Sequence, residues 1–189
     1  MNIILVGGHG VGKTTTARAL GAMLDLPVHD EIGRTLAEDP SERPPGTLAD
    51  DRQPSFDEAV FRAELQRDAL WSSRGSRIVE TWHPGNLAYA SIRSPEVVTR
   101  LLPAVTAATR AAGPVVVVPL TATEEILRRR QSEPGDFWFF REVDRRALQW
   151  ATRLGLRVVP PVSTSEAAPE AVAARVRDLT MSQLRSDRT

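Results

Sequence analysis

The sequence predicts a three-layer α/β/α domain that is built on a five-stranded parallel sheet. Short apolar runs alternate along the chain with longer segments in which apolar residues recur at helical spacing. Strands that alternate with helices in this way pair in parallel, and helices cover both faces of their sheet. A length of 189 residues suits a single substantial core, so residues 1–189 are expected to form one domain.

Five short runs have the composition of buried strands. Residues 115–118 are four consecutive valines, and a β-branched run of this kind is typical of a strand that is buried on both faces. The expected strands lie at residues 2–6, 26–29, 77–81, 115–118 and 156–159.

Helices are expected in the segments between these strands. Ser55 and Glu58 have the spacing of a capping box at a helix start, and Thr121 and Glu124 repeat it. Pro103 is expected to kink or split the helix that contains it. The expected helices begin at Thr14, Ile32, Ser55, Ser94, Thr121, Phe137 and Pro169.

The composition excludes several kinds of site and partner. Basic and acidic residues both number 24, so no general basic field draws the protein onto nucleic acid or an anionic membrane. The chain has no cysteine, and its three histidines lack the spacing of metal ligands. The apolar N-terminus lacks the basic region of a signal peptide, and no apolar run approaches ~20 residues. These features favour a cytoplasmic protein, and they leave homodimer formation open.

The most specific motif follows the first predicted strand. Residues 7–14 read Gly-Gly-His-Gly-Val-Gly-Lys-Thr and fit the pattern G-x-x-x-x-G-K-[ST] between a strand and a helix start. Lys13 is the only lysine in the chain, and the other 23 basic residues are arginine. Because a compact ammonium fits between phosphates where a planar guanidinium does not, the retention of this lysine supports a triphosphate site. The alternative is a glycine-rich turn that binds nothing.

This motif predicts the P-loop NTPase fold with ATP and Mg²⁺ as ligands. Glycines allow successive N–H groups to point inward as an anion nest, and the following helix adds its positive end. Lys13 is expected to bridge the β- and γ-phosphates in catalysis, and Thr14 is expected to ligate Mg²⁺. The residues expected to bind the nucleotide are Gly8, His9, Gly10, Val11, Gly12, Lys13, Thr14 and Thr15.

Acidic residues follow the second and third predicted strands, at the edge of the sheet where ligands bind. Glu80 suits a role at Mg²⁺, where it would hold metal-bound water next to the substrates. Asp30 and Glu31 are placed to accept a proton from a hydroxyl that attacks the γ-phosphate. The alternatives are a helix N-cap at Asp30 or Glu31 and a solvated strand end at Glu80.

Six arginines flank Pro134 and Gly135, and they predict a short helical lid over residues 128–146. Arginines on both sides of a hinge neutralise charge on the transferring group when the lid closes. Arg129 and Arg141 are the expected catalytic members. The alternative is a solvated charged surface with intrahelical pairs. The six residues are Arg128, Arg129, Arg130, Arg141, Arg145 and Arg146.

Two further segments bear on the expected substrate side. Residues 137–140 are all aromatic, and most of them are expected to lie in the core. Residues 39–54 contain four prolines among polar residues and predict a long loop.

These features together resemble the nucleoside and nucleotide kinase branch of P-loop proteins. Residues 30–34, Asp-Glu-Ile-Gly-Arg, resemble the Glu-x-x-Arg element of ribosylnicotinamide-kinase-like ATPase domains, which implies a catalytic Glu31 and a substrate-binding Arg34. The acid at position 80, followed by Leu-Ala-Tyr at 87–89, is similar to a passage of thymidylate and deoxynucleoside kinases. Residues 124–129 and 139–143 resemble the helix–lid–helix segment of thymidylate kinases.

Residues that bind the acceptor are expected to come from the loop at 39–54, the helix that begins at Ser55 and the segment 82–89. Trp82 and Tyr89 are the expected substrate contacts, together with Arg34 and Glu80. Residues 82–86 read Trp-His-Pro-Gly-Asn where these kinases have an arginine after the acid. The resemblance therefore implies a reaction type and leaves the substrate open.

The sequence thus predicts an ATP- and Mg²⁺-dependent phosphotransferase that acts on a small molecule such as a nucleoside or nucleotide. A Ras-type GTPase needs a second lysine in its guanine-reading element, and Lys13 is the only one. A motor or AAA+ machine needs a further helical domain, for which 189 residues leave little room. The alternative function is an ATP-hydrolysing or ATP-binding regulatory protein with no small-molecule acceptor.

Overall fold

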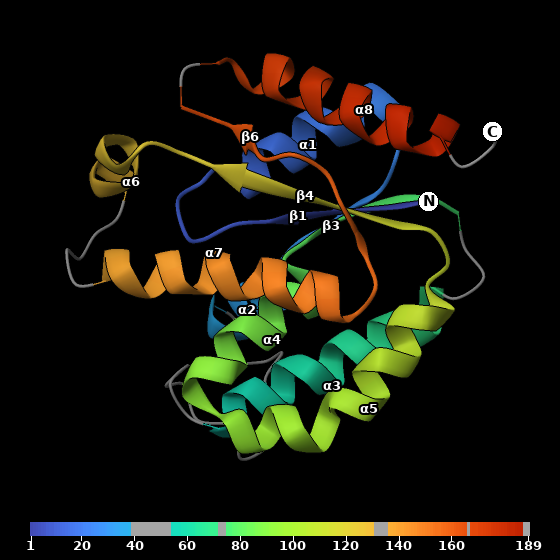
Figure 1. The fold of residues 1–189 in the computed structure, drawn as a ribbon, viewed down its shortest axis with the longest axis vertical. Helices are drawn as coiled ribbons and strands as arrows, with labels where there is room; N and C mark the ends of the chain where they lie inside the picture. The colour runs from blue at the N-terminus through green and yellow to red at the C-terminus, as the bar shows by residue number, and fades with distance from the viewer. Residues whose placement is uncertain (39–53, 72–74, 131–135, 166, 187–189) are drawn as a thin grey trace.

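The computed structural model describes residues 1–38, 54–71, 75–130, 136–165 and 167–186. Its centre is a parallel sheet with the strand order β2-β3-β1-β4-β5, and a short sixth strand continues from it by pairing with β4 (Figure 1). The predicted α/β class with a parallel sheet between helices is therefore confirmed. The strands are β1 (Asn2–Val6), β2 (Val28–His29), β3 (Arg77–Glu80), β4 (Val115–Thr121), β5 (Arg157–Val158) and β6 (Val162–Ser163).

Helices cover both faces of this sheet. Helices α1 (Lys13–Leu24) and α8 (Pro169–Ser186) lie together on one face, and α4 (Trp82–Arg93) and α7 (Asp136–Arg153) lie on the other (Figure 1). Beyond α4, helices α3 (Pro54–Trp71) and α5 (Pro95–Ala111) form an additional outer layer. The two short helices are α2 (Ile32–Glu38) and α6 (Glu124–Arg130).

Strand β1 shows why the apolar runs are continuous. Ile3 and Leu5 pack into the cluster under α1 and α8, whereas Ile4 and Val6 pack into the cluster under α4 and α7. Successive strand residues point to opposite faces, so a central strand needs an apolar residue at every position. All five residues of β1 are buried.

The sheet register brings the candidate site residues to one edge. Leu5 pairs with Glu80 of β3 on one side and with Val118 of β4 on the other. The chain therefore leaves β1 for the glycine loop at the level where Glu80 ends β3. The carboxyl ends of parallel strands share one edge, which is the edge expected to bind ligands.

Helix α4 was not predicted from the sequence, because Trp-His-Pro-Gly-Asn has the composition of a turn. Pro84 is tolerated because it lies in the first turn, where a helix makes no bond to the residue's own N–H. Strand β6, of two residues, was also missed.

The expected helix caps at Ser55 and Thr121 and the expected split at Pro103 were wrong. Ser55 lies inside α3, which begins at Pro54. Pro103 does not split α5, which continues from Pro95 to Ala111. Pro103 has no N–H to donate to the carbonyl one turn earlier in the helix. Because the proline is exposed, water can donate to that carbonyl instead. Thr121 is the last residue of β4 and does not cap α6. The predicted loop at 39–54 and the hinge at Pro134 and Gly135 lie outside the described residues, except for Pro54.

The aromatic segment at the start of α7 is divided between core and surface. Phe137 is buried, while 75% of Trp138 is exposed. None of the described helices is long and apolar enough to cross a membrane.

Candidate functional site

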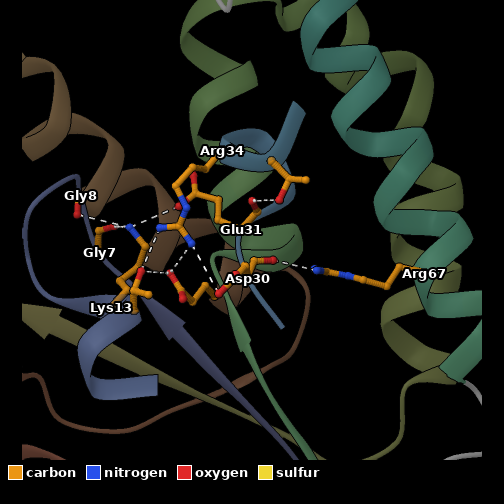
Figure 2. Close-up of polar contacts among 10 residues, drawn as sticks. Gly7, Gly8, Lys13, Asp30, Glu31, Arg34 and Arg67 are labelled. Atoms are coloured by element: carbon orange, nitrogen blue, oxygen red, sulfur yellow. Dashed lines mark hydrogen bonds and ion pairs between the residues drawn. The ribbon is translucent and has the colours of Figure 1, made fainter. Parts of the chain in front are cut away.

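The glycine loop connects β1 to α1 and folds around the ammonium of Lys13. Nζ of Lys13 donates to the carbonyl oxygens of Gly7 at 2.8 Å and Gly8 at 3.4 Å (Figure 2). Gly12 precedes the helix with φ 91°, a left-handed conformation that favours glycine. The loop therefore has the conformation of an anion nest at the positive end of α1.

Glu31 lies beside this ammonium. Its Oε2 atom is 3.5 Å from Nζ of Lys13 (Figure 2). Burial raises the pKa of Glu31, but Lys13, the Thr81 hydroxyl and Arg34 together outweigh burial and hold the pKa below its usual range. The carboxylate is therefore ionised at neutral pH.

Glu31 caps the start of α2 through its backbone carbonyl and not through its side chain. The Glu31 carbonyl accepts the Thr35 N–H at 3.2 Å, in the first turn of α2. Its side chain remains directed at Lys13. Asp30 is exposed, and its carboxylate lies 3.6 Å from Arg34.

Glu80, Thr14 and Arg34 form a second cluster at the same edge. The Thr14 hydroxyl donates to Oε2 of Glu80 at 2.8 Å, and Arg34 donates to the Thr14 hydroxyl at 2.9 Å. Arg34 also lies 3.6 Å from Oε2 of Glu80. The Glu80 side chain is fully buried, which excludes a solvated strand end.

The surroundings of Glu80 fit a divalent cation. Burial raises the pKa of Glu80, against the hydrogen bond from Thr14 and the charges of Arg34 and Lys13. Its Oε1 atom is buried and has no hydrogen-bond partner among the described residues. A hydroxyl and a carboxylate at the end of a phosphate loop are the oxygen donors that Mg²⁺ uses with nucleotide phosphates. No group of three or more candidate metal ligands occurs among the described residues.

The backbone after Glu80 is strained. Thr81 has φ 69° and ψ −65°, and Trp82 has φ 48°, conformations that are rare for non-glycine residues. The carboxylate of Asp68 on α3 accepts from Nε1 of Trp82 at 3.0 Å and lies 2.6 Å from Nε2 of His83. Asp68 therefore holds the turn that places Glu80 and Thr81 at the site.

One cavity of about 1040 Å³ extends from the glycine loop to helices α3 and α4. Its far wall contains an ion pair between Asp57 of α3 and Arg93 of α4. Of the two aromatic residues expected to contact the substrate, Tyr89 lines the cavity and Trp82 does not, because its ring is buried against Asp68. The lining also includes His9, Lys13, Thr14, Glu31, Arg34, Phe61, Asn86 and Arg130.

The arginines of the predicted lid differ in their contacts. Arg129 pairs with Glu125 on the exposed side of α6, and the guanidinium of Arg141 lies 5.9 Å from the Phe137 ring centroid. Arg145 and Arg146 both pair with Glu142, as the surface alternative expects. The role of a lid over residues 128–146 stays a prediction.

Arg130 is the member of the cluster that contacts the glycine loop. It donates to the Gly10 carbonyl at 2.9 Å and lines the cavity. The sequence contained a signal for this difference. Arg128 and Arg129 each have a glutamate four residues earlier, whereas Arg130 has Ile126 at that position and therefore no such intrahelical partner.

Asp144 of α7 also lies at the glycine loop and was not identified from the sequence. It accepts a hydrogen bond from the Gly8 N–H and faces the charge of Lys13. A single acidic residue within a charged helix gives no sequence signal that separates it from surface acids.

A parallel sheet that delivers a lysine-containing glycine loop, an acid after β3 and a basic helix at its carboxyl edge defines a P-loop nucleotide-binding domain. Within this class, the chain belongs to the family described as "AAA domain", whose model matches residues 2–167. No curated protein matches the sequence.

Solved structures with this fold include several P-loop kinases. A shikimate kinase from Aquifex aeolicus has a TM-score of 0.58 at 14% identity, over 97% of this chain and 98% of that one. A NadR protein in complex with NR has a TM-score of 0.68 at 17% identity, over 95% of this chain and 51% of that one. The chain thus spans about half of the NadR chain.

A third structure is a YorR protein from Bacillus subtilis in complex with phosphorylated GDP. It has a TM-score of 0.58 at 16% identity, over 98% of each chain. These matches show the kinase-like P-loop fold. They do not support the narrower resemblance to thymidylate and deoxynucleoside kinases.

Proposed function

We propose that this protein is an ATP- and Mg²⁺-dependent phosphotransferase that transfers the γ-phosphate to a small-molecule acceptor. The observation that carries the proposal is the continuous cavity of about 1040 Å³ between the glycine loop and the α3–α4 wall. Pockets for one small ligand commonly enclose ~300–1000 Å³, so this cavity has room for a nucleotide and an acceptor together.

The glycine loop binds the triphosphate. Backbone N–H groups of residues 8–15 surround the phosphates, and Lys13 exchanges its bonds to the Gly7 and Gly8 carbonyls for phosphate oxygens. Thr14 and Glu80 would hold Mg²⁺, and Arg34 donates to the same Thr14 hydroxyl. Bound Mg²⁺ supplies charge neutralisation on the transferring group.

Glu31 serves as the base for an acceptor hydroxyl. In the free protein its carboxylate pairs with Lys13. When Lys13 moves to the phosphates, Glu31 loses its nearest cation, and its pKa rises toward the ordinary value. A carboxylate that becomes more basic on nucleotide binding suits proton transfer from a hydroxyl. Asp30, which is exposed, has the lesser role.

The α3–α4 wall binds the acceptor. Tyr89 offers an aromatic face, Asn86 offers an amide, and the Asp57–Arg93 pair offers both charges. Arg34 lines the same cavity and donates to the Thr14 hydroxyl. The wall suits a polar metabolite such as a nucleoside or nucleotide, and it gives no role to nucleic acid or to a membrane. The sequence has no cysteine, which suits a reducing compartment, so we place the protein in the cytoplasm.

The test is acceptor-dependent release of ADP. Wild-type protein with ATP and Mg²⁺ is assayed against nucleosides, nucleotides and other hydroxylated metabolites. We expect slow background hydrolysis and a marked rate increase with one chemical class. Lys13→Ala provides the inactive control. If ATP is hydrolysed at one rate whatever acceptor is present, the protein is the regulatory ATPase of the alternative.

A further inference from the structure

The glycine loop is in close contact with α7. A Cβ atom built on Gly8 would lie 3.0 Å from Cβ of Phe140 and 3.3 Å from Oδ1 of Asp144. Phe140 and Asp144 are four residues apart, so they lie on the same side of the helix. Gly8 is therefore needed for close approach, and through it one carboxylate lies against the phosphate-binding loop.

This carboxylate is poorly compensated. The Gly8 N–H donates to it, but Oδ1 is buried and has no hydrogen-bond partner among the described residues. Two cations face it, Lys13 from α1 and Arg141 from its own helix. Lys13 is shared with Glu31 and two carbonyl groups.

Two further titratable groups lie near this carboxylate. His9 is exposed on the glycine loop, with its ring 5.7 Å from that of Phe140. On the α4 side, Arg146 donates to the Ser91 carbonyl at 2.8 Å, and its second partner is Glu142. Burial raises the pKa of Asp144 to about 6, although Gly8, Lys13 and Arg141 act against it.

We infer that Asp144 takes up a proton from solvent when a triphosphate binds to the glycine loop. The inference rests on nucleotide binding at this loop, as proposed above. A triphosphate adds negative charge to the Asp144 surroundings and draws Lys13 onto phosphate oxygens. Both changes disfavour the carboxylate and favour the neutral acid. The neutral acid can remain against Gly8, so α7 keeps its position while the site accepts the phosphates.

The inference sets the sign of the pH dependence. At pH 7 a carboxyl with a pKa of about 6 is roughly 90% ionised in the free protein. If binding raises this pKa by about one unit, binding takes up roughly 0.4 proton at pH 7, so nucleotide affinity rises as pH falls. The affinity becomes nearly constant below about pH 5, where the Asp144 carboxyl of the free protein is already largely protonated.

Calorimetric titration of the wild-type chain with the non-hydrolysable analogue AMP-PNP and saturating Mg²⁺ tests this inference. Two buffers of different ionisation enthalpy at pH 7 give the number of protons taken up. We expect an uptake that disappears in Asp144→Asn, whose side chain stays neutral and can still accept the Gly8 N–H. We also expect Asp144→Asn to bind about tenfold more tightly than wild type at pH 7.5, if binding raises the Asp144 pKa by about one unit, and similarly at pH 5.5.

Two matched variants exclude other sources of protons. His9→Asn removes the loop histidine, and Glu142→Gln removes an acid of α7 that lies two residues from Asp144. Glu142→Gln should retain both nucleotide binding and the proton uptake. His9→Asn changes a residue of the proposed nucleotide site and should retain the uptake per nucleotide bound. The uptake of the nucleotide itself is the same in all variants and cancels in the comparison.

The outcomes separate this inference from the proposed function. Failure of the wild-type chain to bind AMP-PNP contradicts nucleotide binding at the loop. Binding with equal proton uptake in wild type and Asp144→Asn contradicts the role of Asp144 alone. Loss of the uptake in His9→Asn assigns the proton to the histidine and also overturns the inference.

Discussion

At the scale of single residues, the site depends on the partners of a few charged groups. Lys13 is 7% exposed and divides its hydrogen-bonding capacity between two loop carbonyls, with Glu31 as its ion-pair partner. Glu80 is fully buried beside Thr14. Because these groups satisfy one another in the free protein, a triphosphate with Mg²⁺ must exchange several of these contacts.

Replacement of Lys13 tests the glycine loop. Lys13→Ala and Lys13→Arg should each lower phosphoryl transfer by orders of magnitude, because neither side chain supplies a compact ammonium between phosphates. Circular dichroism should show a retained fold. Arg18→Ala, on an exposed face of the same helix, is the matched control and should keep wild-type turnover. Near-normal turnover in Lys13→Ala would refute the assignment.

Glu80 and Glu31 should differ in what their replacement changes. Glu80→Gln removes a charge at the proposed Mg²⁺ site, so the Mg²⁺ concentration for half-maximal rate should rise severalfold. Glu31→Gln should slow the chemical step by about 10²-fold or more, with little change in nucleotide affinity. Single-turnover rates across a Mg²⁺ series separate these effects. Equal Mg²⁺ curves for wild type and Glu80→Gln would exclude the metal role.

The loop motif and both acids could be predicted, because their position after short apolar strands is visible in the sequence. The sequence did not single out Arg130 or Asp144 as residues that contact the glycine loop. Their function depends on how α6 and α7 pack on the loop, which is a tertiary contact between residues more than 100 positions apart.

At the scale of elements, the connection from β3 to α4 is the least regular part of the site. Two consecutive residues with positive φ follow Glu80, and such conformations persist only where surrounding contacts enforce them. Asp68 supplies two of these contacts from α3. Sequence analysis could not detect this arrangement, because Asp68 and the turn are brought together only by the packing of α3 on α4.

Asp68→Ala should therefore disturb the proposed Mg²⁺ site from a distance. We expect a lower kcat and a raised Mg²⁺ requirement, as the turn relaxes and Glu80 shifts. Asp68→Asn should recover part of the activity, because its oxygen can accept from Trp82 and its amide can donate to the other tautomer of His83. Thr109→Val, a buried change on α5, controls for general loss of stability. A matching loss of melting temperature in both, with an unchanged Mg²⁺ requirement, would leave Asp68 a purely structural residue.

Helix α6 allows a direct comparison of adjacent arginines. Arg130→Ala removes a charge-assisted hydrogen bond to Gly10, which contributes on the order of 1 kcal/mol, so nucleotide affinity should fall about fivefold. Arg129→Ala removes only an exposed ion pair with Glu125 and should have little effect. Hydrogen exchange over residues 128–146 with nucleotide and acceptor tests the predicted lid. A larger loss in Arg129→Ala would restore the sequence-based prediction for that residue.

At the scale of the whole molecule, one face of the sheet forms an apolar core and the other carries helices that reach the ligand edge. The face under α1 and α8 is a continuous apolar core. On the other face, α4 and α7 carry residues that reach the ligand edge, and α3 and α5 support α4 from outside. The alternation of strands and helices predicted the three-layer core. The additional helix layer was not predicted, because the sequence does not specify which helix packs on another.

Asp144 should make the stability of the free protein dependent on pH. Its folded pKa of about 6 lies above the ordinary aspartate value, so the folded state binds its proton more tightly than the unfolded chain. The stability is therefore highest below about pH 4 with respect to this group and is lost as pH rises through 6. Asp144→Asn should be more stable than wild type at pH 8, by up to about 3 kcal/mol, and equal to it near pH 4. Urea unfolding at both pH values measures this difference, and a constant difference would contradict it.

The fate of the γ-phosphate tests the central claim most directly. Wild-type protein is incubated with γ-³²P-labelled ATP, Mg²⁺ and an acceptor chosen by the ADP-release screen, and the products are separated by chromatography. The account predicts label in a new small-molecule product that forms only when acceptor and Lys13 are both present. Label that appears only as inorganic phosphate, at a rate independent of every acceptor, would contradict it.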